Sequence, residues 1–84
     1  MEYIFHSDAG HGWLEVDRDE LVELRIADQI SAYSYRRGNK VYLEEDCDAS
    51  TFMNALDAKG IKPSIEYAAQ EDESFIRSLP RYRY

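Results

Sequence analysis

The 84-residue chain has 17 acidic and 10 basic side chains, hence a formal net charge of −7, and its length leaves room for one hydrophobic core, so we expect one domain. The charge disfavours binding to nucleic-acid phosphates, where lysine and arginine must replace counterions, and favours a partner with a basic surface. Because Cys47 is the only cysteine and neither a signal peptide nor a membrane-spanning run is visible, we expect a cytoplasmic protein.

The N-terminal residues predict a β-hairpin. Residues 2–6 are rich in Tyr, Ile and Phe, and residues 13–16 alternate between two faces. In the connecting stretch SDAGHG, we expect Asp8 to hold the turn through its side chain, while Gly10 or Gly12 adopts a positive φ angle. This turn is expected to direct Trp13 into the main core.

A first helix is expected after this hairpin. Asp17 is a favoured N-cap residue, and Glu20 stands at the position that completes a capping box. Leu21, Leu24 and the stem of Arg25 are expected to face inward.

Residues 32–45 contain the strongest local signal, a second hairpin. Two alternating, tyrosine-rich runs flank Gly38-Asn39, a pair that suits a two-residue turn. This turn pairs Arg37 with Lys40, Tyr35 with Tyr42 and Tyr33 with Glu44, so that Tyr33, Tyr35 and Tyr42 share one face. That face is either covered by helices as part of the core, or exposed as a protein-binding surface.

A second helix and a last strand follow. Asp48 or Ser50 is expected to cap the helix, and Gly60 to end it. Its apolar stripe consists of Ala49, Phe52, Met53 and Leu56. Residues 62–68 alternate as a strand, which Pro63 places at a sheet edge.

The order β-β-α-β-β-α-β predicts an α+β fold, with a mainly antiparallel sheet and two helices packed on one face. We assign residues 1–70 to this domain and residues 71–84 to a partly flexible C-terminal tail.

Two groups of side chains could carry chemistry. His6, Asp8 and His11 have metal-ligand spacing, but the turn interpretation is favoured because short His/Asp patterns often arise by chance. We therefore expect no metal, no cofactor and no enzymatic activity. The alternative is a small metal-dependent enzyme that uses these three residues, with a carboxylate from Asp46.

The second group is EEDCD, residues 44–48, which forms a dense anionic surface beside the hairpin. Its acids disfavour a reactive Cys47 thiolate, and we expect Cys47 to point into the core. A Cys47–His11 dyad is a further alternative. The predicted partner-binding residues are Glu44, Glu45, Asp46 and Asp48, together with Tyr33, Tyr35 and Tyr42.

The motifs HxDxGHGWLEV and YSYxxGxxVYLEEDCD, with IRS near the C-terminus, resemble those of a group of small proteins from phages, prophages and plasmids. The resemblance covers His6 to Arg77 and implies a mobile-element accessory protein. Since small acidic phage proteins often act as inhibitors, the resemblance further implies an inhibitor of the anti-CRISPR or anti-restriction type.

We accordingly predict a phage- or plasmid-encoded interaction protein that inhibits a host defence nuclease by covering its basic nucleic-acid-binding surface. No direct nucleic-acid or membrane binding is expected. The metal-dependent enzyme is one alternative to this prediction. A second alternative is a nucleic-acid-binding protein that uses the C-terminal residues Arg77, Arg81, Tyr82 and Arg83.

Overall fold

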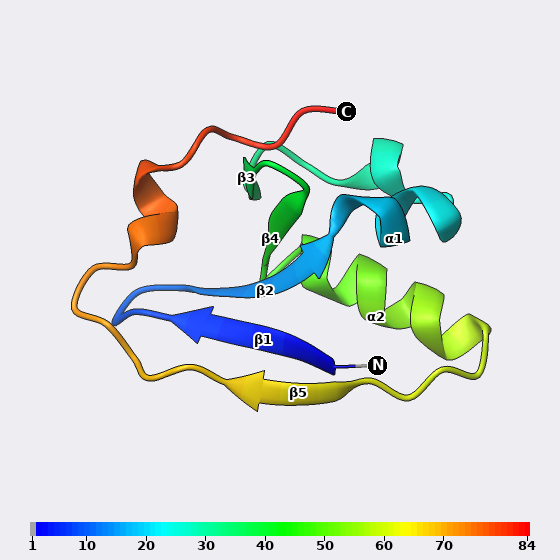
Figure 1. Cartoon of the computed structure of the whole chain (residues 1–84), viewed down its shortest axis with the longest axis horizontal. Helices are drawn as coiled ribbons and strands as arrows, with labels where there is room; N and C mark the ends of the chain where they lie inside the picture. The colour runs from blue at the N-terminus through cyan, green and yellow to red at the C-terminus, as the bar shows by residue number, and fades with distance from the viewer. Residues whose placement is uncertain (1) are drawn as a thin grey trace.

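A computed structural model describes residues 2–84 and shows a single α+β domain, in which a five-stranded sheet is accompanied by two α-helices (Figure 1). This architecture confirms the predicted fold class. The elements in chain order are β1 (Glu2–Ser7), β2 (Gly12–Asp17), α1 (Arg18–Glu23), the 3₁₀ helix η1 (Ala27–Gln29), β3 (Tyr35–Arg37), β4 (Lys40–Glu44), α2 (Asp48–Ala58), β5 (Ser64–Tyr67) and the 3₁₀ helix η2 (Phe75–Ser78). No helix within residues 2–84 is long and apolar enough to cross a membrane.

The sheet has the strand order β3-β4-β2-β1-β5. All neighbouring strands are antiparallel except β5, which lies parallel to β1 at the edge. In the centre of the sheet, β2 and β4 pair Leu14 with Leu43 and Glu15 with Tyr42. Because successive side chains of a strand point to opposite faces, these pairs lie on opposite sides of the sheet.

Both helices pack against the face that carries Leu14 and Leu43, where they form the main core. Leu21 of α1 and Phe52 of α2 are completely buried there, and Met53 packs at its margin. The predicted apolar stripe of α2 is therefore confirmed. Arg25, expected to contribute its stem, is instead exposed.

A smaller core lies on the opposite face and consists of Trp13, Tyr35, Tyr42 and Ile76. Trp13 is buried as predicted, but in this second core and not in the main one. The tyrosine face fits neither interpretation made from the sequence, because Tyr35 and Tyr42 are covered by the C-terminal segment and not by the helices.

The C-terminal segment passes around the end of the β1–β2 hairpin and reaches the β3–β4 hairpin (Figure 1). The Arg36 amide donates a hydrogen bond to the Pro80 carbonyl at 3.0 Å, and the Tyr82 amide donates one to the Ser34 carbonyl at 2.8 Å. The Tyr82 side chain is 3% exposed, and its hydroxyl donates a hydrogen bond to the Ala27 carbonyl. Much of the segment that was expected to be a partly flexible tail thus packs against the sheet, with Ser74, Ile76 and Tyr82 buried.

The β3–β4 hairpin has the predicted turn and register. Gly38 has a φ angle of 58°, Arg37 pairs with Lys40, and Tyr35 pairs with Tyr42. Because β3 begins at Tyr35, the strand register does not extend to Tyr33.

Both α-helices end in the same hydrogen-bonded motif. After α2, the Ile61 amide donates to the Leu56 carbonyl, and Gly60 has a φ angle of 72°. This is a Schellman ending, as predicted from Gly60. After α1, the Ile26 amide donates to the Leu21 carbonyl, but the residue with positive φ, at 61°, is Arg25.

The helix starts differ from the predictions. Asp17 precedes α1 but makes no side-chain cap, because its carboxylate accepts a 2.7 Å hydrogen bond from Lys40. Glu20 accepts a 2.6 Å hydrogen bond from the Tyr3 hydroxyl, so no capping box forms. Cys47, and neither Asp48 nor Ser50, is the N-cap residue of α2.

Neither Gly10 nor Gly12 adopts the positive φ that was predicted for one of them; within residues 2–84 it occurs only at Arg25, Gly38 and Gly60. Gly12 is needed for a different reason. A Cβ atom there would lie 2.3 Å from the Phe5 ring, closer than any side chain allows.

We expect Ile76→Val to lower the free energy of unfolding by about 1 kcal/mol, because it leaves a small cavity at a completely buried position. Ile4→Val is the matched control, since Ile4 is 37% exposed. Urea unfolding should show less than half the loss for the control. Equal losses would contradict the assignment of the C-terminal segment to the core.

The left-handed conformation at Arg25 yields a second prediction. We expect Arg25→Gly to be more stable than Arg25→Ala by about 1 kcal/mol, because both remove the charged side chain but only glycine relieves the strain at positive φ. Thermal unfolding measures the difference. Gly60→Ala, at the equivalent position after α2, should lose a similar amount.

Candidate functional site

A cleft of about 470 Å³ opens where the β1–β2 turn, the end of β4 and the C-terminal segment meet. Its walls combine acidic, aromatic and basic side chains. They are His11, Trp13, Tyr33, Tyr35, Glu44, Asp46, Cys47, Arg77 and Arg81. Many of the residues singled out from the sequence line this cleft.

The His11 side of the cleft is fixed by Asp8. This carboxylate accepts hydrogen bonds from the amides of Gly10 and His11, each at 3.0 Å, and from the amide of Ser74 at 3.1 Å. It also forms a bidentate ion pair with Arg77. The Arg77 Nη2 donates to Oδ1 at 2.9 Å, and Nε donates to Oδ2. Asp8 therefore holds the turn as predicted, and it also ties the turn to the C-terminal segment.

The Arg77 guanidinium, with help from the three amides, holds the pKa of the Asp8 carboxyl well below its usual range. The same contact raises the pKa of Arg77. Both groups are therefore charged at neutral pH and neutralise each other within the protein.

The acidic side of the cleft is a loop that joins β4 to α2, and Asp48 anchors its far end. Asp48 is 1% exposed, and its Oδ2 accepts hydrogen bonds from the amide and hydroxyl of Ser31, at 3.0 and 2.7 Å, and from the hydroxyl of Ser34. The Ser34 hydroxyl in turn accepts a 3.0 Å hydrogen bond from the Glu44 amide. Asp48 is thus a structural group inside the protein and does not belong to the accessible acids.

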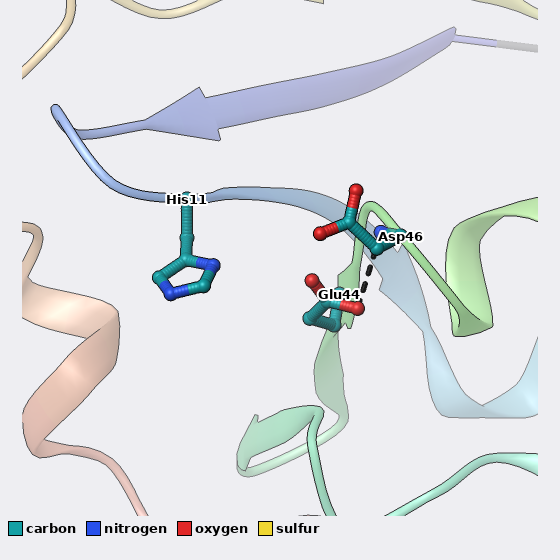
Figure 2. Close-up of side chains that lie close together, drawn as sticks. All are labelled: His11, Glu44 and Asp46. Atoms are coloured by element: carbon teal, nitrogen blue, oxygen red, sulfur yellow. Dashed lines mark hydrogen bonds between the residues drawn. The ribbon is translucent and has the colours of Figure 1, made fainter.

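The two sides of the cleft are also joined directly. The Glu45 amide donates a 3.0 Å hydrogen bond to the Gly12 carbonyl, and the Asp46 amide donates a 3.1 Å hydrogen bond to the Glu44 carboxylate. As a result, ligand atoms of His11, Glu44 and Asp46 all lie within 4.8 Å of one another (Figure 2). Within residues 2–84, no other set of three or more His, Cys, Asp or Glu side chains comes together closely enough to bind one metal ion.

The metal set predicted as an alternative, His6, Asp8 and His11, is not assembled. His6 Nε2 lies 2.9 Å from the Glu15 carboxylate, and its ring contacts the ring of Phe75. The Asp8 carboxylate is fully engaged by Arg77 and backbone amides. Of the three residues, His11 alone belongs to the cleft.

The seven predicted partner-binding residues divide into two groups. Glu45 and Asp46 are exposed, Glu44 is half-buried, and the Tyr33 ring is 68% exposed. Tyr35, Tyr42 and Asp48 are buried, with exposed fractions of 9%, 1% and 1%. A partner that docks on the folded protein can therefore reach the first group.

Cys47 is exposed on the cleft and does not point into the core, contrary to the prediction. The negative charge of Asp48 raises the pKa of its thiol, as expected from the surrounding acids. Although His11 lines the same cleft, this environment keeps the thiol protonated and disfavours a Cys47–His11 nucleophile.

Of the four C-terminal residues that the nucleic-acid alternative uses, Arg77, Arg81 and Arg83 are exposed, whereas Tyr82 is not. Arg77 is paired with Asp8, and Tyr82 is buried. The guanidinium of Arg81 lies 4.7 Å from the centre of the Tyr35 ring and donates a hydrogen bond to the Ala32 carbonyl. Arg83 is exposed.

The alternative metal set predicted from the sequence joined His11 with Asp46, but it included His6 and Asp8 and missed Glu44. The grouping of His11 with Glu44 and Asp46 follows from the antiparallel pairing of β2 with β4, which places Trp13 opposite Glu44. These strands belong to different hairpins, so no turn sequence indicates that they are neighbours. The signal available in the sequence was that both strands alternate between an aliphatic and an aromatic face. Leu14 and Leu43 belong to the aliphatic face, and Trp13 and Tyr42 to the aromatic one.

Comparison of the chain with protein-family models, with curated proteins and with solved structures gives no match. The resemblance to small phage and plasmid proteins therefore stays a prediction, and the site must be interpreted from its own geometry.

We expect Asp8→Asn to lower the free energy of unfolding at pH 7, because it leaves Arg77 without its partner. The lowered pKa of Asp8 stabilises the folded state above the carboxyl's unfolded pKa of about 4, and this stabilisation is lost as pH falls below it. Urea unfolding should thus show a constant difference between the two proteins above about pH 5, and a shrinking one below pH 4. Asp57→Asn, at an exposed position of α2, should show neither effect.

Proposed function

We propose that this chain is a non-enzymatic interaction protein of a phage or plasmid that acts in the bacterial cytoplasm. It binds a lysine- and arginine-rich, nucleic-acid-binding surface of a host defence nuclease and thereby inhibits it. The observation that carries the proposal is the concentration of Glu44, Asp46 and the exposed ring of Tyr33 on one cleft. The proposal rests further on the net charge and on the resemblance to mobile-element proteins.

The cleft suits a lysine or arginine side chain of a partner. Carboxylates at its acidic side can accept charge-assisted hydrogen bonds from a guanidinium or ammonium group. The exposed face of Tyr33 can stack on the same cation, and tyrosine is enriched among the residues that contribute most to protein interfaces. Arg77 does not oppose this binding, because Asp8 already neutralises its charge.

The dimensions of the domain limit what it can imitate. Its longest extent is 35 Å, and duplex DNA of that length carries about 20 phosphates. A net charge of −7 cannot replace them. Local occupation of a basic groove, through one cleft and the adjacent exposed acids, is therefore the better supported form of inhibition.

The test is capture of partners from bacterial lysate, followed by cleavage assays on any nuclease that is retained. The charge-reversal variant Glu44→Lys/Glu45→Lys/Asp46→Lys should lose both capture and inhibition by about tenfold or more, because it replaces attraction by repulsion. Glu45 and Asp46 are exposed and Glu44 is half-buried, so the melting temperature of the variant should stay within a few degrees of the wild type.

The matched control is Asp19→Lys/Glu23→Lys/Asp57→Lys, whose three positions lie on exposed parts of α1 and α2. Each reversal adds two charges, so both variants change the net charge from −7 to −1. The control should keep its partner. Retention of the same proteins by both variants would show that the acidic cleft is not the binding surface.

A further inference from the structure

We propose that His11, Glu44 and Asp46 bind a divalent transition-metal ion, with zinc as the best fit. Their ligand atoms lie within 4.8 Å of one another, whereas ligands of a tetrahedral zinc ion are about 3.4 Å apart, given metal–ligand bonds of about 2.1 Å. The difference is about 1.4 Å, and side-chain rotation can close it, because His11 and Asp46 are exposed and Glu44 is half-buried.

The ligand atoms are available for a metal. Within residues 2–84, the His11 ring makes no hydrogen bond, and its recorded contact is with the Trp13 ring, at a centroid distance of 6.1 Å. The Asp46 carboxylate likewise accepts no hydrogen bond, and Glu44 accepts one on Oε2, from the amide of Asp46. In Figure 2 the imidazole of His11 and the two carboxylates lie around a common space.

The backbone beneath these side chains is fixed before any metal binds. Asp8 anchors His11, Asp48 with Ser34 anchors Glu44, and the bond from the Glu45 amide to the Gly12 carbonyl joins the two segments. A site on such a backbone loses little conformational entropy on binding. This distinguishes the group from acids that meet by chance on a flexible surface.

Trp13 lies next to the metal group. It is 2% exposed and lines the cleft beside His11. Its indole Nε1 is the one buried side-chain nitrogen or oxygen within residues 2–84 that lacks a hydrogen-bond partner. Because this atom has almost no accessible surface, it does not take part in the proposed coordination, and the site rests on its three ligands alone.

The arginines of the cleft do not prevent cation binding. Arg77 forms its ion pair with Asp8, and Arg81 is held against the Tyr35 ring. The two carboxylates of the metal group therefore provide the negative charge that a divalent ion requires.

The ligand set of one imidazole nitrogen and two carboxylates determines which metal ion binds most tightly. Imidazole suits zinc, whereas magnesium and calcium prefer oxygen ligands alone. The expected order of affinity is zinc, then manganese, then magnesium, in agreement with the general order for such ligand sets. Three protein ligands leave one tetrahedral position for water.

The experiment is a titration of the full chain with Zn²⁺, Mn²⁺ and Mg²⁺ after treatment with a chelator, followed by calorimetry and by Trp13 fluorescence. Trp13 is the only tryptophan and contacts His11, so it reports occupancy directly. We expect one saturable zinc per chain. His11→Ala and Asp46→Asn should each weaken zinc binding by about tenfold or more, while circular dichroism and melting temperature without metal stay unchanged.

Two controls separate this site from its neighbours. His6→Ala removes the other histidine, and Cys47→Ser removes the thiol that lines the same cleft; both should bind zinc as the wild type does. Absence of saturable zinc binding, unchanged binding by His11→Ala, or loss of binding in Cys47→Ser would each overturn the proposal. The titration uses the metal alone, so its result does not depend on the proposed partner, which can be tested in the presence of chelator.

Discussion

The side chain of Asp8 is 2% exposed, and a buried charge persists in a small protein only when hydrogen bonds and an opposite charge replace the lost water. Three amides and Arg77 do so here. Because Ser74 and Arg77 are more than sixty residues away in sequence, satisfying this charge draws the C-terminal segment onto the β1–β2 turn. The second face of the sheet is covered as a consequence.

That cover creates the cleft. Ile76 packs with Trp13 and Tyr42 in the smaller core, while Arg77 and Arg81 of the same segment line the cleft. A domain of this size buries a modest share of its surface, and here it does so in two cores on opposite faces of one sheet. The concave region lies at the border of the smaller core, where buried aromatic rings meet the exposed acids.

Local signals predicted the parts of the fold that depend on a few adjacent residues. Gly38-Asn39 defined a turn and its register, and Gly60 defined the end of α2, because positive φ is a property of one residue. Side chains with several possible partners were not predictable in this way. Asp17 was expected to cap α1 but binds Lys40, and Asp48 was expected at the surface but is buried with two serines. In each case the side chain bonds to a partner more than ten residues away in sequence and not to the nearby backbone amides of its helix.

The same reason explains why the cleft was only partly predicted. Its acids and Tyr33 were found from composition, whereas their proximity to His11 depends on strand pairing between two hairpins.

The two proposed ligands of the cleft, a basic side chain and a divalent cation, draw on the same two carboxylates, Glu44 and Asp46. Both ligands are positive, and each is stabilised by the negative charge that the other would neutralise. Binding of one must therefore weaken binding of the other by the same free energy, since coupling between two ligands of one protein is reciprocal. Glu45 and Tyr33 stand outside the metal group and remain available to a partner in either state. Metal binding would accordingly reduce the attraction for a basic surface without removing the whole interface, which makes the occupancy of His11, Glu44 and Asp46 a means of adjusting the affinity of the acidic cleft.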